Sequence, residues 1–428
     1  MNILKDLPEL IKADVISSET ADKIRSYYKS KEQQSSNKLL ISFGILGSLL
    51  IGLGIILIIA HNWDDLSNTI KTICAFFPLL IGQIVATYVF IKQRESIAWR
   101  EAAAVFLFIA VAVCISLISQ IYNIPGSIAS FMLTWLLLTI PLVYILRSSL
   151  VSLFVIVGIS YYHIYNNYWS HVTPPDYWYF AFILLVIPHY VQLLKENKWN
   201  GFIAFHHWLL SISILVVIPV FIKTNEQLIV IAYASTLASL YIVGSLINFE
   251  NKKWISNGYK IVAAILSMSL CYMLSFKSFW YDITKATYEF HELQDYSEVI
   301  IGTVSTLIAI ILLIIKVRNK SIREIQALDV LFLFILPIYF IGHFTTLAQV
   351  LMNLIIFAIG LYTIWQGHQK NHLGIINYGL LIISILIICR FFDSNLNFIV
   401  RGLLFVLVGI GFLATNLFII KKRKSNES

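Results

Sequence analysis

Long stretches without a charged residue alternate with short charged segments along the whole chain. A helix that crosses the hydrocarbon core of a bilayer needs roughly 20 mostly apolar residues, and a charge at its centre costs roughly 2.5–3.5 kcal/mol on insertion scales. Twelve stretches of 16 residues or more lack Asp, Glu, Lys and Arg. They are residues 39–63, 72–91, 102–146, 148–175, 177–194, 199–222, 227–249, 261–276, 299–315, 330–369, 371–389 and 402–420.

Two of these stretches are about twice the length that one helix needs, and each has a polar break in its middle. Residues 102–146 contain the segment Gln120–Gly126, and residues 330–369 contain the segment Gly342–Thr346. Polar residues with Gly or Pro mark turns between periodic segments. The pattern therefore predicts an all-α, polytopic integral membrane protein with about 14 transmembrane helices.

The basic residues fall mainly on one side of these helices. If the N-terminus is cytosolic, the inner side receives 25 of the 31 Lys and Arg residues, which leaves formal charges of +12 inside and −4 outside. Cytoplasmic loops of membrane proteins carry an excess of Lys and Arg. The distribution predicts that both termini are cytosolic.

The composition agrees with this class of protein. Hydrophobic residues make up 58% of the chain and charged residues 13%, with a mean hydropathy of +0.80. Soluble domains are about 45–50% apolar and 25% charged, so the composition excludes a soluble enzyme and a nucleic-acid-binding protein. All four cysteines lie inside predicted spans, without disulfide or metal-ligand spacing, and we expect no metal and no cofactor.

The predicted organisation has three parts. Residues 1–37 are expected to form a small cytosolic helical hairpin, which either docks a cytosolic partner or packs on the membrane face. Residues 38–420 form the transmembrane bundle, and residues 421–428 form a basic cytosolic tail. Seven helices in each of two halves, 38–222 and 227–420, would make the second half inverted relative to the first, as in many secondary transporters.

Several segments resemble one family of bacterial membrane proteins. They are Leu7–Ser17, Glu19–Tyr28, Gly47–Asp64 with its His61-Asn-Trp-Asp64 end, Glu101-Ala-Ala-Ala and Ser119–Gly126, with Arg390–Ser394 and Arg401–Gly411 near the C-terminus. In this order they resemble the domain of unknown function 2157, over roughly residues 1–150 and the last helices. The resemblance implies a multi-pass protein of the bacterial cytoplasmic (inner) membrane. It implies no activity, substrate or cofactor.

Polar residues recur at helix ends on the predicted outer side. The candidate substrate-binding residues of this outer vestibule are Asn62, Trp63, Asp64, Gln120, Tyr122, Arg390, Asp393 and Arg401. In one interpretation the two arginines bind an anion, the carboxylates orient them and the aromatic rings form apolar walls. In the other, the rings anchor the protein at headgroup depth and the charges are simply solvated.

Glu101 is a separate candidate, on the predicted inner side. It stands at the start of 45 uncharged residues, so it could relay protons or hold a cation if it faces the bundle interior. Alternatively it complements the dipole of its own helix and pairs with Arg100.

Three functions remain open at the level of sequence. No GxSxG, HExxH, Walker or GxGxxG motif is present, so no catalytic residues are assigned, and this argues against an enzyme. Transport of a polar, anionic or lipid-linked solute across the inner membrane is favoured, because nearly the whole chain is membrane-embedded. The alternatives are a membrane enzyme that acts on a lipid-linked substrate from the outer face, and a noncatalytic scaffold or sensor. The oligomeric state is not predicted.

Overall fold

The structure is a computed structural model, and it describes the central part of the chain most completely. The described ranges are 17–26, 63–169, 177–196, 201–221, 228–247, 254–285, 297–319, 324–345 and 347–393, with isolated positions between 7 and 50 and between 399 and 413. Every regular element in these ranges is a helix.

The longer helices follow the charge-free stretches of the sequence. They are α3 (Asn68–Lys92), α4 (Ile97–Ile121), α5 (Ile128–Thr139), α7 (Ser149–Ile164), α8 (Trp178–Lys195), α9 (Gly201–Val217), α10 (Ile229–Leu246), α11 (Gly258–Leu274), α13 (Ser297–Asn319), α14 (Ala327–Gly342), α15 (Leu347–Gln369) and α16 (Leu373–Asp393). Shorter elements are α6 (Leu142–Ile145), α12 (Lys277–Lys285), the π-helix Tyr165–Trp169, and 3-10 turns at Ile218–Phe221 and Trp254–Ser256.

The described part of the chain confirms the multi-span helical prediction. Ten of its helical segments are long and apolar enough to cross a membrane, and two shorter apolar helices, α11 and α14, accompany them. These twelve correspond to twelve of the 14 predicted spans. The other two, residues 39–63 and 402–420, and most of the predicted hairpin at 1–37, lie outside the described residues.

Both polar breaks predicted from the sequence separate helices. The first separates α4 from α5, where Ser127 caps α5 and exchanges hydrogen bonds with Ser130 in a capping box. The second separates α14 from α15 after Gly342. Pro141 adds an interruption between α5 and α6, because proline cannot donate the backbone hydrogen bond that a continuing helix needs.

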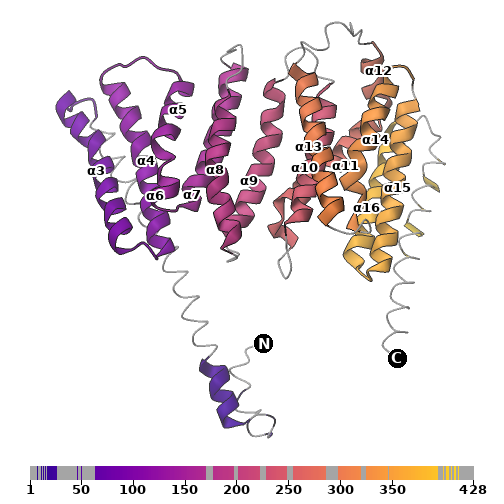
Figure 1. The fold of residues 1–428 in the computed structure, drawn as a ribbon, viewed down its shortest axis with the longest axis horizontal. Coiled ribbons are helices and arrows are strands. Elements are labelled where there is room, and N and C mark those ends of the chain that lie inside the picture. Colours follow the sequence, from indigo (N-terminus) through magenta and orange to yellow (C-terminus); the bar gives the residue numbers. More distant parts are fainter. Residues whose placement is uncertain are drawn as a thin grey trace. The chain divides into compact units, whose positions relative to one another are not determined.

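The chain divides into two compact units. One comprises residues 1–77 and 120–123, and the other comprises residues 78–119 and 124–428. In the second unit α7 packs against α5, α8 and α9, α10 packs against α11, α13 and α14, and α15 packs against α11, α14 and α16. Figure 1 shows that the long helices of this unit run approximately parallel to one another.

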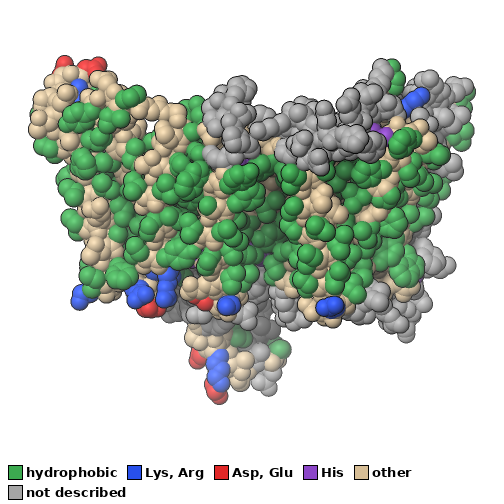
Figure 2. All heavy atoms as spheres, turned by 45° about the horizontal axis from the view of Figure 1, so that its top comes forward, with side chains coloured by type: hydrophobic (Ala, Val, Ile, Leu, Met, Phe, Trp, Pro, Cys, Tyr) green, Lys and Arg blue, Asp and Glu red, His purple; other side chains and the backbone are tan. Residues whose placement is uncertain are grey.

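The surface of these helices is apolar, as lipid contact requires. Figure 2 shows hydrophobic side chains over most of their visible surface, with Lys and Arg mainly along one edge. Many large apolar side chains are exposed there, including Ile84, Leu184 and Ile311. The hydrophobic effect cannot hold helices together in lipid, so close packing and buried polar contacts must do so.

The hairpin of α15 and α16 is held by such close packing. A Cβ added to Gly379 would lie 2.8 Å from the carbonyl oxygen of Gly360 and 2.8 Å from the backbone nitrogen of Ile364. These neighbours are backbone atoms, which cannot rotate away. Gly379 therefore sets the distance between the two helices.

We expect Gly379→Ala to destabilise the protein by about 1–3 kcal/mol, because the added methyl group forces the two helices apart. The free energy of unfolding can be measured by titration with sodium dodecyl sulfate in mixed micelles. Gly201→Ala is the matched control, since only the Phe205 ring, at 3.9 Å, lies near the added Cβ. Equal stability of the two variants would contradict this role of Gly379.

Candidate functional site

The vestibule residues of the first unit lie around the start of α3. The Tyr122 hydroxyl is 3.0 Å from the Thr72 hydroxyl, and the Lys71 ammonium lies 5.7 Å from the centre of the Trp63 ring. Asp64 is exposed. Gln120, also exposed, belongs to this unit, whereas Asn62 lies outside the described residues.

The vestibule residue Arg390 belongs to the second unit, at the end of α16. It donates from Nη2 to the Ser275 hydroxyl at 3.1 Å, and its guanidinium lies 5.0 Å from the centre of the Phe276 ring. Asn353 on α15 donates to the Ser275 carbonyl at 3.3 Å. These contacts join the ends of α11, α15 and α16. The Asp393 side chain and Arg401 lie outside the described residues, so the vestibule as one site stays a prediction.

Glu101 lies at the N-terminus of α7, although it belongs to α4. Its carboxylate accepts hydrogen bonds from the Ser149 amide at 2.8 Å, the Leu150 amide at 3.0 Å and the Ser148 hydroxyl at 2.5 Å. The first amides of a helix have no partner within it, and the helix dipole favours a negative charge there. Buried Glu101 thus caps a neighbouring helix, a role that sequence reasoning did not assign to it.

Three buried histidines continue this polar layer across α8 and α9. His206 contacts the Phe202 carbonyl through Nδ1 at 2.8 Å, and its Nε2 is 2.9 Å from the Ser152 hydroxyl. A carbonyl only accepts, so Nδ1 carries the proton and Nε2 accepts from serine. His189 lies 3.4 Å from the Ser149 hydroxyl, and His207 contacts the Ser256 carbonyl at 3.1 Å.

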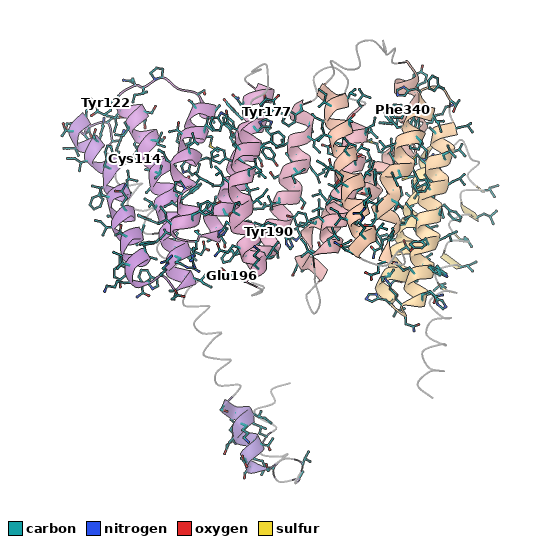
Figure 3. The ribbon with its side chains drawn as sticks, in the orientation of Figure 1. Cys114, Tyr122, Tyr177, Tyr190, Glu196 and Phe340 are labelled. Carbon is teal, nitrogen blue, oxygen red and sulfur yellow. The ribbon has the colours of Figure 1, made fainter. Side chains whose placement is uncertain are left out.

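Tyr190 packs against this layer from α8. Its ring centre lies 5.8 Å from those of His206 and His207. Figure 3 places it in the half of α8 that ends near Glu196, away from Tyr177 at the other end. The layer joins α4, α7, α8 and α9 by hydrogen bonds and ring contacts, as buried polar groups between membrane helices commonly do.

A buried ion pair joins α13 and α14. Lys316 donates to Asp329 at 2.5 Å, and the exposed fractions of the two side chains are 2% and 0%. The same carboxylate oxygen, Oδ2, accepts from the backbone amide of Gln326, the N-cap residue of α14, at 2.7 Å. The other oxygen, Oδ1, is buried and has no hydrogen-bond partner among the described residues.

Sequence reasoning missed this pair because its members adjoin charge-free stretches. Residues 299–315 end one position before Lys316, and residues 330–369 begin one position after Asp329. Both charges were therefore assigned to inner connections. A basic and an acidic residue at facing ends of consecutive spans is the signal that could have suggested the pair.

A polar pocket of about 350 Å³ opens beside the ion pair. It lies among α10, α11, α13, α15 and the residues that precede α14 or follow α15. Its lining contains three lysines and one glutamate, a formal charge of +2. The lining residues are Ser245, Lys260, Lys316, Glu324, Gln326, Tyr362, Trp365, Gln366, Gln369 and Lys370.

Tyrosines lie near the pocket and near Arg390. Tyr241 donates from its hydroxyl to Gln326 at the pocket. Tyr272 donates to the Ile382 carbonyl at 2.9 Å, and its own carbonyl accepts from Ser275, the partner of Arg390. Tyrosines therefore contribute polar groups both at the pocket and beside the contacts of Arg390.

Comparison with known proteins gives one match. Residues 8–152 match the model of a family described as predicted membrane protein (DUF2157), which confirms the resemblance seen in the N-terminal segments. The polar pocket, Arg390 and the remaining C-terminal segments lie beyond the matched residues. No curated protein and no solved structure matches the chain.

Proposed function

We propose that this protein moves a polar, anionic or lipid-linked solute across the membrane, which we take to be the bacterial cytoplasmic membrane. The observation that carries the proposal is the buried Lys316–Asp329 pair at the wall of a polar pocket. Ionisable residues within membrane helices are costly and usually mark substrate or ion pathways. A pair kept only for stability would not need an open, positively charged space beside it.

The pocket supplies the binding step. An anionic solute that enters it meets the Lys316 ammonium, whose present partner is Asp329. Competition between solute and Asp329 for this ammonium would couple binding to the ion pair that joins α13 and α14. Such coupling is what a carrier needs, because a ligand shifts a conformational equilibrium only through its different affinity for the two states.

Arg390 supplies a cation at the other end of the same helices. It is held by Ser275 and Phe276, and Ser275 in turn donates to the Tyr272 carbonyl. In this proposal the solute leaves the pocket through the bundle and passes Arg390.

Flux through proteoliposomes tests the proposal. The full chain would be reconstituted and the entry of three radiolabelled probes measured: inorganic phosphate, glutamate and glycerol 3-phosphate. We expect at least one probe to enter faster than in vesicles that contain the paired variant Lys316→Met/Asp329→Leu. Equal entry for all three probes with both proteins would contradict the proposal.

Removal of residues 1–37 separates transport from the scaffold alternative. We expect the shortened protein to retain flux, because the pocket and the Arg390 cluster lie far along the chain from this segment. Flux is measured in the same vesicles, at matched amounts of inserted protein. A loss of flux would instead indicate that this segment takes part in function.

A further inference from the structure

We infer that Asp329 takes up a proton when the Lys316 ammonium binds the solute, so that one proton crosses the membrane with each monoanionic solute. The inference rests on the proposed function, because it takes the ion pair beside the polar pocket as the solute's site. It adds the coupling ion and the charge of the solute, which follow from the charge balance and the hydrogen bonds of the pair.

The buried pair is neutral, and this limits how an anion can bind to it. The Lys316 ammonium lies 2.5 Å from Asp329 Oδ2, and the exposed fractions of the two side chains are 2% and 0%. An anion that reached this ammonium beside an ionised Asp329 would place two negative charges against one positive charge in the interior. A buried charge without compensation is costly, and a group in that position neutralises instead. A proton on Asp329 restores the balance for a solute that carries one negative charge.

The carboxyl group of Asp329 has one oxygen that can take a proton. Oδ2 accepts from the Lys316 ammonium and from the Gln326 backbone amide at 2.7 Å, whereas Oδ1 is buried and has no hydrogen-bond partner among the described residues. A protonated carboxyl group gains one donor and keeps acceptor capacity on its other oxygen. With the proton on Oδ1, Oδ2 can still accept from the amide at the start of α14 while the ammonium turns to the solute.

Both oxygens of Glu101, the other buried carboxylate, are already used. Oε1 accepts from the Ser149 amide, and Oε2 accepts from the Ser148 hydroxyl and the Leu150 amide. A proton on either oxygen would weaken a hydrogen bond that the buried group already makes. We therefore place the carried proton on Asp329, and Glu101 keeps its role as a cap.

The pocket brings the solute to the pair. Two of its lining residues, Lys316 and Gln326, are the hydrogen-bond donors to Asp329. The other titratable groups around the site are Tyr241 on α10, Lys260 on α11, Glu324 before α14, Tyr362 on α15 and Lys370 after it. Within the described part of the chain, Asp329 forms an ion pair with Lys316 alone, so the carboxylate loses its counter-charge when the solute takes the ammonium.

Accumulation against a gradient tests the inference in proteoliposomes that contain the full chain. The probes are radiolabelled glutamate and isethionate, which each keep one net negative charge near neutral pH, while potassium and valinomycin abolish the membrane potential. A pH gradient of about two units, acidic outside, should drive accumulation toward about a hundredfold, the limit for one proton per monoanion. Entry of a probe without accumulation, or entry of inorganic phosphate or glycerol 3-phosphate alone, would overturn the inference and leave the proposed transport standing. No entry of any probe would overturn both.

Asp329→Asn separates the proton from the solute. The amide is a neutral counterpart of the protonated carboxyl group, and its oxygen can accept from the Gln326 amide. We expect this variant, purified with the probe as counter-charge for Lys316, to exchange external for internal probe but to lose accumulation. Asp65→Asn is the matched control and should keep both, since Asp65 is exposed in the connection that precedes α3.

Two results with this variant would overturn the inference. One is accumulation by Asp329→Asn equal to that of the control. The other is loss of exchange in the folded variant, which would mean that the carboxylate itself is needed to hold the solute. If the variant does not fold, the gradient measurement on the wild-type chain decides.

Discussion

Replacing Asp329 with leucine is expected to destabilise the protein by about 3–5 kcal/mol. The exchange leaves the Lys316 ammonium buried, with an exposed fraction of 2%, and removes its carboxylate partner. Removing one member of a buried ion pair costs this much because an uncompensated charge remains in a low-dielectric interior. The free energy of unfolding in mixed micelles checks the expectation.

The paired exchange Lys316→Met/Asp329→Leu should recover most of this stability. Apolar residues of similar volume often replace a buried ion pair at little cost. If the pair serves transport, the recovered protein should still be unable to move its solute. A double variant with wild-type stability and wild-type flux would show that the pair is dispensable for both.

Replacing Glu101 with alanine is expected to destabilise the protein by at least about 3 kcal/mol. The exchange removes the acceptor of two backbone amides and of the Ser148 hydroxyl, and a buried donor left unpaired costs about 1–3 kcal/mol. Unfolding in mixed micelles measures the loss. Glu95→Ala is the control, because that carboxylate is exposed in the connection that precedes α4.

Glu101→Gln distinguishes the cap from the predicted proton relay. The glutamine oxygen can still accept from the α7 amides, but its NH2 group replaces the second carboxylate oxygen and faces a hydrogen-bond donor. We therefore expect the free energy of unfolding to fall by about 1–2 kcal/mol. A cap that carries no proton should leave flux at its wild-type rate at matched protein levels. Loss of flux in a stable Glu101→Gln protein would favour the relay.

The fold was predictable from the sequence to the extent that charge determines where helices can cross a membrane. The helices on either side of the polar breaks, such as α4 and α14, follow from the cost of placing polar groups in hydrocarbon. What a side chain contacts across helices was not predictable in the same way. Hydropathy locates spans one by one, whereas packing depends on how the helices rotate and pair.

The candidate site shows this difference directly. Glu101 was recognised as an unusual residue, but its partners follow 47 to 49 positions later and are helix-terminal amides that no motif identifies. The sequence pattern places Lys316 and Asp329 in inner connections, because each stands at a span boundary. The structure places both in the protein interior, where α13 and α14 each pack against α10.

In the proposed transport, solute crosses the bundle between the polar pocket and Arg390. Tyr378 is partly buried against the core of the bundle, whereas Leu381, less than one turn further along α16, is 51% exposed on the surface of the protein and faces lipid in a membrane. A cysteine in place of Tyr378 should be accessible to water, whereas a cysteine in place of Leu381 should not.

The decisive measurement is the reaction of Tyr378→Cys with a membrane-impermeant methanethiosulfonate reagent, in a chain whose four native cysteines are replaced by alanine. We expect modification both in intact cells and in inverted membrane vesicles, while Leu381→Cys stays unmodified in each. Modification of Tyr378→Cys from one side only would mean that the pocket does not lead across the membrane, and would contradict the proposed transport.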